Sequence, residues 1–123
     1  MKKRILIADD KESSRELIRT VLERSGYEIL EAQDGGEALA RAREAKPDLF
    51  VLDLQMPILD GFGVLAELRR DPRFTAIPVV ALTASAMPAD RERVLGAGFT
   101  SYITKPVSLA ALRSEVARLL ASE

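Results

Sequence analysis

Three aspartates follow short apolar segments of the sequence, at positions where a carboxylate is costly to desolvate. Asp53 follows the run Leu49–Leu52, and Asp9 and Asp10 follow a run that ends at Ala8. If the three carboxylates lie together, their mutual repulsion raises their pKa values, and a divalent cation would relieve it. Oxygen ligands favour a hard ion, and Mg²⁺ fits best because it accepts a few carboxylates and keeps several waters.

Two further polar groups stand at the ends of later apolar runs. Thr83 ends the run before Ala84, and Lys105 follows the run Ser101–Thr104. A metal ion, an ammonium and a hydroxyl around one acid suit a phosphoryl group, whose transfer depends on positioning and charge neutralisation. An aspartate can itself accept the phosphoryl group covalently. Asp53 is therefore a candidate nucleophile.

Each of these residues also has an ordinary structural interpretation. Asp9 and Asp10 could cap a helix, and Asp53 could be a turn or cap residue. Thr83 and Ser85 are types that commonly start helices, and a lysine is most often solvated. The joint pattern favours chemistry, because four separate segment ends would each have to supply a matching group by chance.

The elements that would position these residues alternate along the chain. Short apolar runs rich in β-branched residues predict strands at Arg4–Ala8, Glu28–Ala32, Leu49–Leu52, Pro78–Leu82 and Ser101–Thr104. Segments with helical period lie between them. The alternation predicts five βα units and a parallel sheet covered by helices on both faces. In such sheets ligands bind outside the carboxyl ends of the strands, which is where the polar groups fall.

Local signals predict the helix boundaries. The first helix is expected to have one apolar face, formed by Leu17, Ile18, Val21 and Leu22. Asp34 and Glu37 are spaced as in a capping box at the start of the second helix. The other helices are expected to begin after Asp60, near Pro88 and after Ser108.

Composition limits the function further. The 123 residues suit one domain, and a net charge of −1 gives no global case for nucleic-acid binding. The chain has no cysteine and no histidine, so thiol chemistry and imidazole ligands are excluded. The N-terminal apolar run is too short for a signal peptide or a membrane span, which predicts a cytoplasmic protein without membrane contact.

The segments ILIADD, VLDLQMPILDG, VVALTA and YITKPVS together resemble the receiver domain of two-component response regulators. The resemblance covers essentially the whole chain, residues 1–123. It implies a (βα)5 doubly wound, flavodoxin-like fold, with a five-stranded parallel sheet in the order 2-1-3-4-5. It also implies phosphorelay signalling by a protein that catalyses only its own phosphorylation and dephosphorylation.

The resemblance assigns roles to the acidic site. Asp53 matches the phosphoacceptor. Asp9 and Asp10 match the acidic pair that holds Mg²⁺, and the backbone carbonyl of Gln55 would complete the protein ligands. Gln55 and Ser85 occupy positions that vary in the family and are linked to dephosphorylation rate, so the phosphoryl lifetime stays open.

The resemblance also implies a conformational switch. Thr83 matches the switch hydroxyl, and Tyr102 matches the aromatic switch position, although a half-buried core tyrosine is the alternative. Lys105 matches the lysine that contacts the phosphoryl oxygens, and its bond to Pro106 is expected to be cis. Phosphorylation would change the surface formed by the fourth helix, the fifth strand and the fifth helix.

Partners follow from the same resemblance. The phosphodonor would be a histidine kinase or a histidine phosphotransfer protein, and a downstream protein target would bind the phosphorylated form. The protein is expected to be a monomer or weak dimer without direct nucleic-acid contact. A stand-alone regulator is favoured, and a fragment of a longer regulator or hybrid kinase is the alternative. Exposed arginines on the last two helices are either a solvated face or a partner surface: Arg91, Arg93, Arg113 and Arg118.

Other classes of function fit less well. A phosphohydrolase of the haloacid-dehalogenase type needs a second acid two residues after the nucleophile, where this chain has Gln55. A flavodoxin-type electron carrier needs a phosphate loop after the first strand, but the segment ADDKESS would repel a phosphate. A pseudo-receiver that only binds partners is disfavoured by the complete acidic set.

Overall fold

Strands and helices alternate along residues 2–121, the part of the chain that the computed structural model describes. The strands are β1 (Arg4–Ala8), β2 (Glu28–Ala32), β3 (Leu49–Asp53), β4 (Val79–Thr83) and β5 (Ser101–Thr104). The helices are α1 (Glu12–Arg24), α2 (Gly35–Ala45), α3 (Gly61–Arg70), α4 (Pro88–Gly96) and α5 (Leu109–Ala121). All strand pairs are parallel, in the order β2-β1-β3-β4-β5, which confirms the predicted flavodoxin-like fold.

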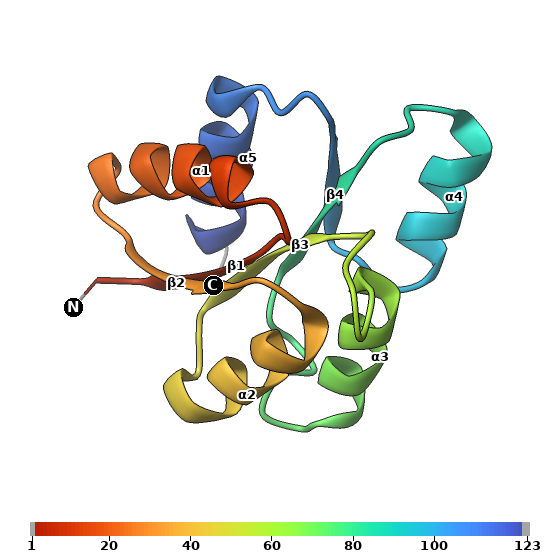
Figure 1. Ribbon diagram of the computed structural model, residues 1–123, viewed down its shortest axis with the longest axis horizontal. Coiled ribbons are helices and arrows are strands. Elements are labelled where there is room, and N and C mark those ends of the chain that lie inside the picture. Colours follow the sequence, from red (N-terminus) through yellow and green to blue (C-terminus); the bar gives the residue numbers. More distant parts are fainter. Residues whose placement is uncertain (1, 122–123) are drawn as a thin grey trace.

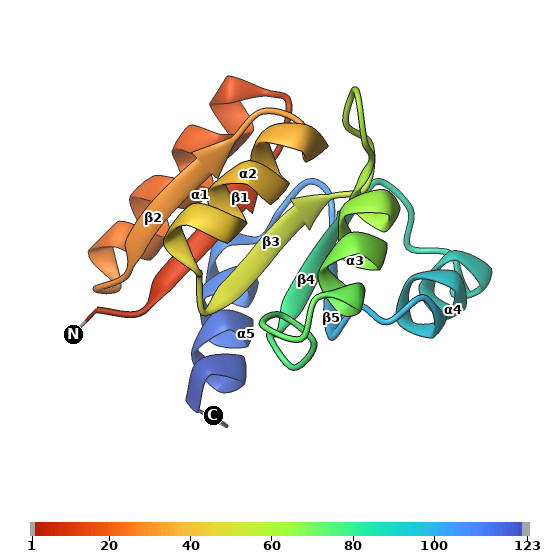
Figure 2. The same cartoon turned by 90° about the horizontal axis from the view of Figure 1, so that it is seen from below.

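The sheet separates two apolar cores. Helices α1 and α5 cover one face, and α2, α3 and α4 cover the other (Figure 1). Figure 2 looks onto the sheet from the side of α2 and α3, with β2 at one end and β5 at the other. Successive side chains of a strand point to opposite faces, so Leu6 and Phe50 join one core while Ile5 and Val51 join the other. This division explains why the strands are apolar without alternation.

Two strands differ from the prediction by one residue. Strand β4 runs Val79–Thr83 instead of Pro78–Leu82, because proline has no N–H to contribute to the ladder. The carbonyl of Pro78 still accepts a hydrogen bond from the Phe50 N–H at 3.0 Å. Strand β3 extends beyond Leu52 to include Asp53. Asp53 and Thr83 are therefore the last residues of their strands, and the ladder itself holds their backbones.

Helix starts follow the predicted caps. The Asp34 carboxylate accepts a hydrogen bond from the Glu37 N–H at 2.7 Å, and the carboxylate of Glu37 lies 3.6 Å from Arg41. Pro88 begins α4. Ser108 Oγ accepts a hydrogen bond from the N–H of the third residue of α5 at 3.2 Å. Local capping chemistry thus places most helix N-termini within a residue of their expected positions.

The predicted apolar face of α1 is wrong at one position. Ile18 and Leu22 are buried against the sheet, whereas the side chain of Leu17 is 59% exposed. Adjacent helical residues are about 100° apart, so Leu17 and Ile18 do not both face the sheet. Ile18 and Leu22 are four residues apart and therefore share the buried face.

The helices are short. The longest, α1 and α5, contain 13 residues each. At about 1.5 Å of rise per residue, each is roughly 20 Å long. Within residues 2–121, none combines the length and apolar character needed to cross a membrane.

Candidate functional site

The carboxyl ends of four strands meet at one edge of the sheet. Ala8 of β1 is paired with Leu52 of β3 in the parallel register, so the residues that follow them, Asp9 and Asp53, are neighbours. Strands β4 and β5 end at the same edge, and Lys105 directly follows β5. Residues far apart in the sequence thus converge through strand register.

The predicted acidic cluster is present. One carboxylate oxygen from each of Asp9, Asp10 and Asp53 lies within 4.8 Å of the others. Asp9 is completely buried and Asp53 is 4% exposed, while Asp10 faces solvent. Among residues 2–121, the buried polar side chains are those of Asp9, Asp53 and Thr83, and all three belong to this edge. The polar interior of the described fold is therefore concentrated at one site.

Lys105 supplies the positive charge. Its Nζ donates to Oδ2 of Asp53 at 3.0 Å and lies 3.5 Å from Oδ2 of Asp9. The other oxygens of these two carboxylates accept backbone hydrogen bonds, from the Gln55 N–H to Asp53 at 3.2 Å and from the Lys11 N–H to Asp9 at 2.9 Å. Three carboxylates thus face one ammonium, which leaves an excess of negative charge suited to a hard cation.

Burial and charge oppose each other at Asp53. Burial raises the pKa of the Asp53 carboxyl above 3.8, and the nearby Asp9 carboxylate raises it further. The hydrogen bonds from Lys105 and the Gln55 N–H reduce this rise without abolishing it. Burial also opposes the charged form of Lys105, but its hydrogen bond and charge interaction with Asp53 dominate and raise its pKa. The ammonium therefore stays charged beside an acid that is costly to ionise.

Thr83 lies at the start of the loop between β4 and α4. Its Oγ1 accepts a hydrogen bond from the Ser85 N–H at 3.2 Å and lies 3.4 Å from the Ser85 carbonyl oxygen. Ser85 Oγ in turn lies 2.6 Å from the Asp90 carboxylate and accepts from the Met87 N–H. A chain of polar contacts therefore connects Thr83 to the first turn of α4.

An open cavity of about 600 Å³ lies over this edge. Its lining includes the predicted residues Asp10, Asp53, Gln55, Thr83 and Lys105. It also includes Phe62 and Arg93, whose guanidinium lies 4.4 Å from the centre of the Phe62 ring. The sequence analysis treated Arg93 as part of a solvated or partner face, and no local pattern indicates its stacking on a residue 31 positions earlier.

Tyr102 lies outside this cavity. It is half-buried in β5, packs against the core on the α2–α4 side, and has the Arg91 guanidinium 5.8 Å from its ring centre. It lines a separate hollow between β5 and α5, together with Pro106 and Ser108. The Lys105–Pro106 peptide bond at the end of β5 is cis.

Gly61 brings the next loop close to the acid, a contact that the sequence analysis did not anticipate. Its N–H donates to the Leu54 carbonyl at 3.1 Å. A Cβ atom added at Gly61 would lie 2.7 Å from the carbonyl oxygen of Asp53 and 2.9 Å from Cα of Leu54. Only glycine fits this approach, so the start of α3 packs directly on the backbone of Asp53.

The chain is similar to known proteins over most of its length. The response regulator receiver domain family matches residues 5–117. The polar-differentiation response regulator DivK of Brucella anthropi is 42% identical over 109 residues, which cover 89% of this chain and 89% of that protein. The chemotaxis response regulator CheY4 of Vibrio cholerae has a similar structure, with a TM-score of 0.92 and 29% identity over 97% of this chain and 99% of that one.

A third similar structure bears on the metal. It is the receiver domain of the sensor histidine kinase PA1611 from Pseudomonas aeruginosa, described with a magnesium ion coordinated in its active-site cleft. Its TM-score is 0.89, with 30% identity over 98% of this chain and 99% of that one. The present chain belongs to the response regulator receiver domain family, whose members act in two-component phosphorelay signalling.

Proposed function

We propose that Asp53 accepts a phosphoryl group from a phosphohistidine on a histidine kinase or a histidine phosphotransfer protein. A carboxylate oxygen of Asp53 attacks phosphorus, the bond between phosphorus and the imidazole nitrogen breaks, and that nitrogen keeps the electron pair. The observation that carries this proposal is the buried Asp53 carboxylate, which shares Lys105 with Asp9 and lies within 4.8 Å of two other carboxylates.

The donor set fits Mg²⁺. The carboxylates of Asp9, Asp10 and Asp53 and the backbone carbonyl of Gln55 would hold the ion, and only oxygen atoms are offered. When bound, Mg²⁺ would neutralise part of the negative charge on the phosphoryl oxygens. Lys105 lies within hydrogen-bonding distance of Asp53, so it is placed to stabilise an oxygen of a phosphoryl group attached to Asp53.

The response to phosphorylation is assigned to Thr83 and Tyr102. The Thr83 hydroxyl would leave its contacts with Ser85 and turn toward the phosphoryl group, which would shift the loop that leads into α4. Tyr102 packs beside α4 and would follow this movement. The surface of α4, β5 and α5 would then differ between the two states, and a downstream protein would bind one of them.

The test is the intact mass of the protein after incubation with acetyl phosphate, with and without MgCl₂. We expect one added phosphoryl group that requires both Mg²⁺ and Asp53, and no addition to Asp53→Ala. Asp60→Ala is a matched control, since Asp60 lines the same cavity but caps α3 through the Gly63 N–H. If no adduct forms, binding of beryllofluoride to the wild type would indicate rapid hydrolysis, and failure of both would contradict the proposal.

A further inference from the structure

The backbone of Asp9 is held on both sides. Its N–H donates to the Ala32 carbonyl oxygen at 3.1 Å, at the end of β2. Its carbonyl oxygen accepts a hydrogen bond from Nη1 of Arg15 at 2.7 Å. The peptide group to which this carbonyl belongs continues directly into Asp10. A donor on this oxygen therefore restrains the turn that carries both acidic residues.

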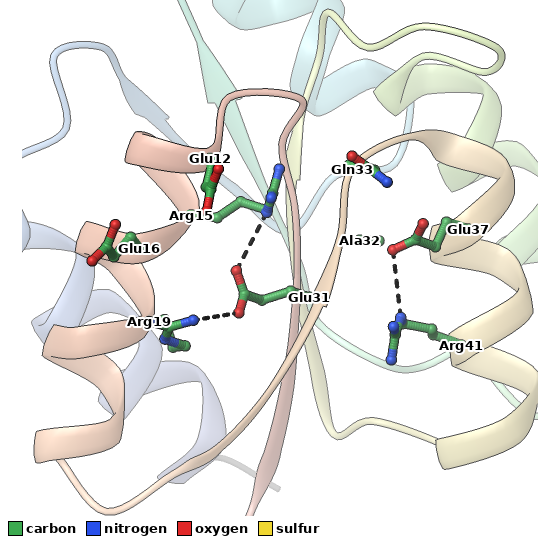
Figure 3. Close-up of a pocket in the computed structure, with 9 residues that line it drawn as sticks. All are labelled: Glu12, Arg15, Glu16, Arg19, Glu31, Ala32, Gln33, Glu37 and Arg41. Carbon is green, nitrogen blue, oxygen red and sulfur yellow. Dashed lines mark hydrogen bonds and ion pairs between the residues drawn. The ribbon is translucent and has the colours of Figure 1, made fainter.

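Arg15 is itself fixed by an acid on β2. Its Nε lies 3.3 Å from Oε1 of Glu31, and the side chains of Arg15 and Glu31 are only 14% and 29% exposed. Figure 3 shows Arg15 and Arg19 reaching Glu31 from the same helix, on the α1 side of a groove whose other side is α2. The groove has a volume of about 330 Å³ and includes a second ion pair, between Arg41 and Glu37.

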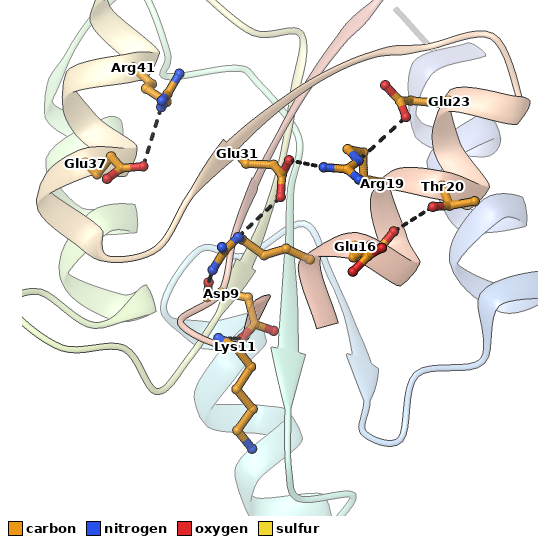
Figure 4. Close-up of polar contacts among 10 residues, drawn as sticks. Asp9, Lys11, Glu16, Arg19, Thr20, Glu23, Glu31, Glu37 and Arg41 are labelled. Atoms are coloured by element: carbon orange, nitrogen blue, oxygen red, sulfur yellow. Dashed lines mark hydrogen bonds and ion pairs between the residues drawn. The ribbon is translucent and has the colours of Figure 1, made fainter. Parts of the chain in front are cut away.

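The two arginines on Glu31 differ in what else they contact. Nη1 of Arg19 lies 2.7 Å from Oε2 of Glu31, and its Nε lies 3.7 Å from Glu23 on the same helix (Figure 4). Arg15 instead uses its Nη1 on the Asp9 carbonyl. A guanidinium can do this because its donors point in fixed directions from one plane, and a charged donor gives a shorter and stronger hydrogen bond. Of the two arginines described on Glu31, it is Arg15 that also contacts Asp9.

We propose that Arg15, oriented by Glu31, is a positioning residue for the metal site: it fixes the Asp9–Lys11 turn so that the Asp9 and Asp10 carboxylates face the same point. This inference rests on the proposed function in assuming that those carboxylates hold Mg²⁺. The N-cap residue Lys11 adds no side-chain hydrogen bond to the helix start, so the contacts described between α1 and this turn are the backbone hydrogen bond from the Arg15 N–H to the Lys11 carbonyl and the Arg15 side chain on Asp9. The hydrogen bond from the Lys11 N–H to Asp9 Oδ1 is the contact that should loosen first when Arg15 is removed.

The test compares Arg15→Met with Arg19→Met in the full chain. Both substitutions remove a guanidinium from Glu31, but only the first removes a donor from Asp9. Titration with MgCl₂ by calorimetry should show about tenfold weaker binding for Arg15→Met, in the range found when partners of metal ligands are removed. Arg19→Met should stay within about twofold of the wild type, since its contacts lie outside the acidic turn.

A second readout needs no metal. Hydrogen exchange of the Lys11 amide, followed by NMR in metal-free protein, should be at least about threefold faster in Arg15→Met and unchanged in Arg19→Met, because local opening of the turn costs less free energy. Unfolding by urea separates these effects from a general loss of stability. Equal effects of the two substitutions on Mg²⁺ affinity, or none from Arg15→Met, would overturn the inference.

Arg15→Lys keeps the test decisive if Arg15→Met does not fold. A lysine keeps the charge but lacks the fork that reaches Asp9 and Glu31 together, so its Mg²⁺ affinity should lie below that of the wild type. Wild-type affinity in Arg15→Lys would again contradict the role of Arg15. If the wild type itself binds no Mg²⁺, the proposed metal site fails, which is a different result from normal binding that is insensitive to Arg15.

Discussion

Nζ of Lys105 lies 3.0 Å from Oδ2 of Asp53, although the two residues are 52 positions apart in the sequence. Lys105 follows β5 and Asp53 ends β3, so β4 lies between their strands. The ion pair therefore spans a neighbouring strand over the carboxyl edge of the sheet. It places the Lys105 ammonium against the carboxylate that we propose as the phosphoacceptor.

Loss of the Lys105 ammonium should slow phosphorylation. Lys105→Met removes the charge that stabilises both the ionised Asp53 and the developing charge on the phosphoryl oxygens. We expect the initial rate of adduct formation with acetyl phosphate and Mg²⁺, measured by intact mass, to fall at least about tenfold. Lys2→Met, at an exposed position before β1, is the control. A wild-type rate in Lys105→Met would rule out this role for the lysine.

Replacement of Asp53 by a neutral residue should stabilise the metal-free protein at neutral pH. Because the folded-state pKa of Asp53 is raised, the folded protein binds more protons than the unfolded chain, and its stability falls as the pH rises. Asp53→Asn removes this cost and should unfold at a higher urea concentration than the wild type at pH 7. The difference should disappear below the ordinary value of 3.8, where the carboxyl is protonated in both states.

Asp10→Asn is the matched control for that experiment. Asp10 belongs to the same acidic cluster but faces solvent, so Asp10→Asn removes a carboxylate that is not buried. Its urea midpoint should change less than that of Asp53→Asn. A lower midpoint for Asp53→Asn than for the wild type at pH 7 would mean that the ion pair with Lys105 outweighs the burial of the carboxylate.

A methyl group at Gly61 should damage both the fold and the site. Gly61→Ala places Cβ against the backbone of Asp53 and Leu54, and overpacking of this kind costs about 1–3 kcal/mol in the free energy of unfolding. Gly96→Ala is the control, because no atom lies within 4 Å of its added Cβ. In the last residue of a helix, that change should be neutral or stabilise by up to about 1 kcal/mol. Equal unfolding midpoints for the two variants would contradict the close approach of Gly61.

Arg69 should be a main contributor to stability at the edge of the sheet opposite the site. Its Nη1 donates to the carbonyl oxygens of Phe74 and Ile77 at 3.0 and 2.9 Å, and its Nη2 donates to that of Gly98 at 3.1 Å. Removal of the guanidinium takes a charged donor from these partly buried and exposed carbonyls, so Arg69→Met should destabilise the fold by about 1–3 kcal/mol in urea unfolding.

Arg70→Met tests whether that effect is specific. Arg70 is the next residue of α3. Among the interactions described, its partner is Glu67, in an exposed ion pair of 2.9 Å. Exposed ion pairs of this kind contribute about 0.3–0.5 kcal/mol. Similar losses from the two substitutions would mean that the carbonyl contacts of Arg69 add little.

Local patterns in the sequence determined the class of fold. The apolar strand runs, the caps at Asp34 and Ser108 and the alternation of elements depend on residues within a few positions of each other. They also placed a polar group at the ends of four strands, which was sufficient to predict the acidic cluster. The errors at this level are the exposed Leu17 and the one-residue differences in β3 and β4, and they concern which face a residue takes or where a strand begins and ends.

The tertiary structure alone decided which charged groups are partners. Several lysines and arginines of this chain are similar in local context, yet Lys105 bonds Asp53, Arg15 bonds the Asp9 carbonyl, and Arg93 stacks on Phe62. These choices depend on strand register and on where each helix packs, which are set by burial of the two cores and not by spacing along the chain. A long side chain can reach many potential partners in the unfolded chain, and the folded structure selects among them.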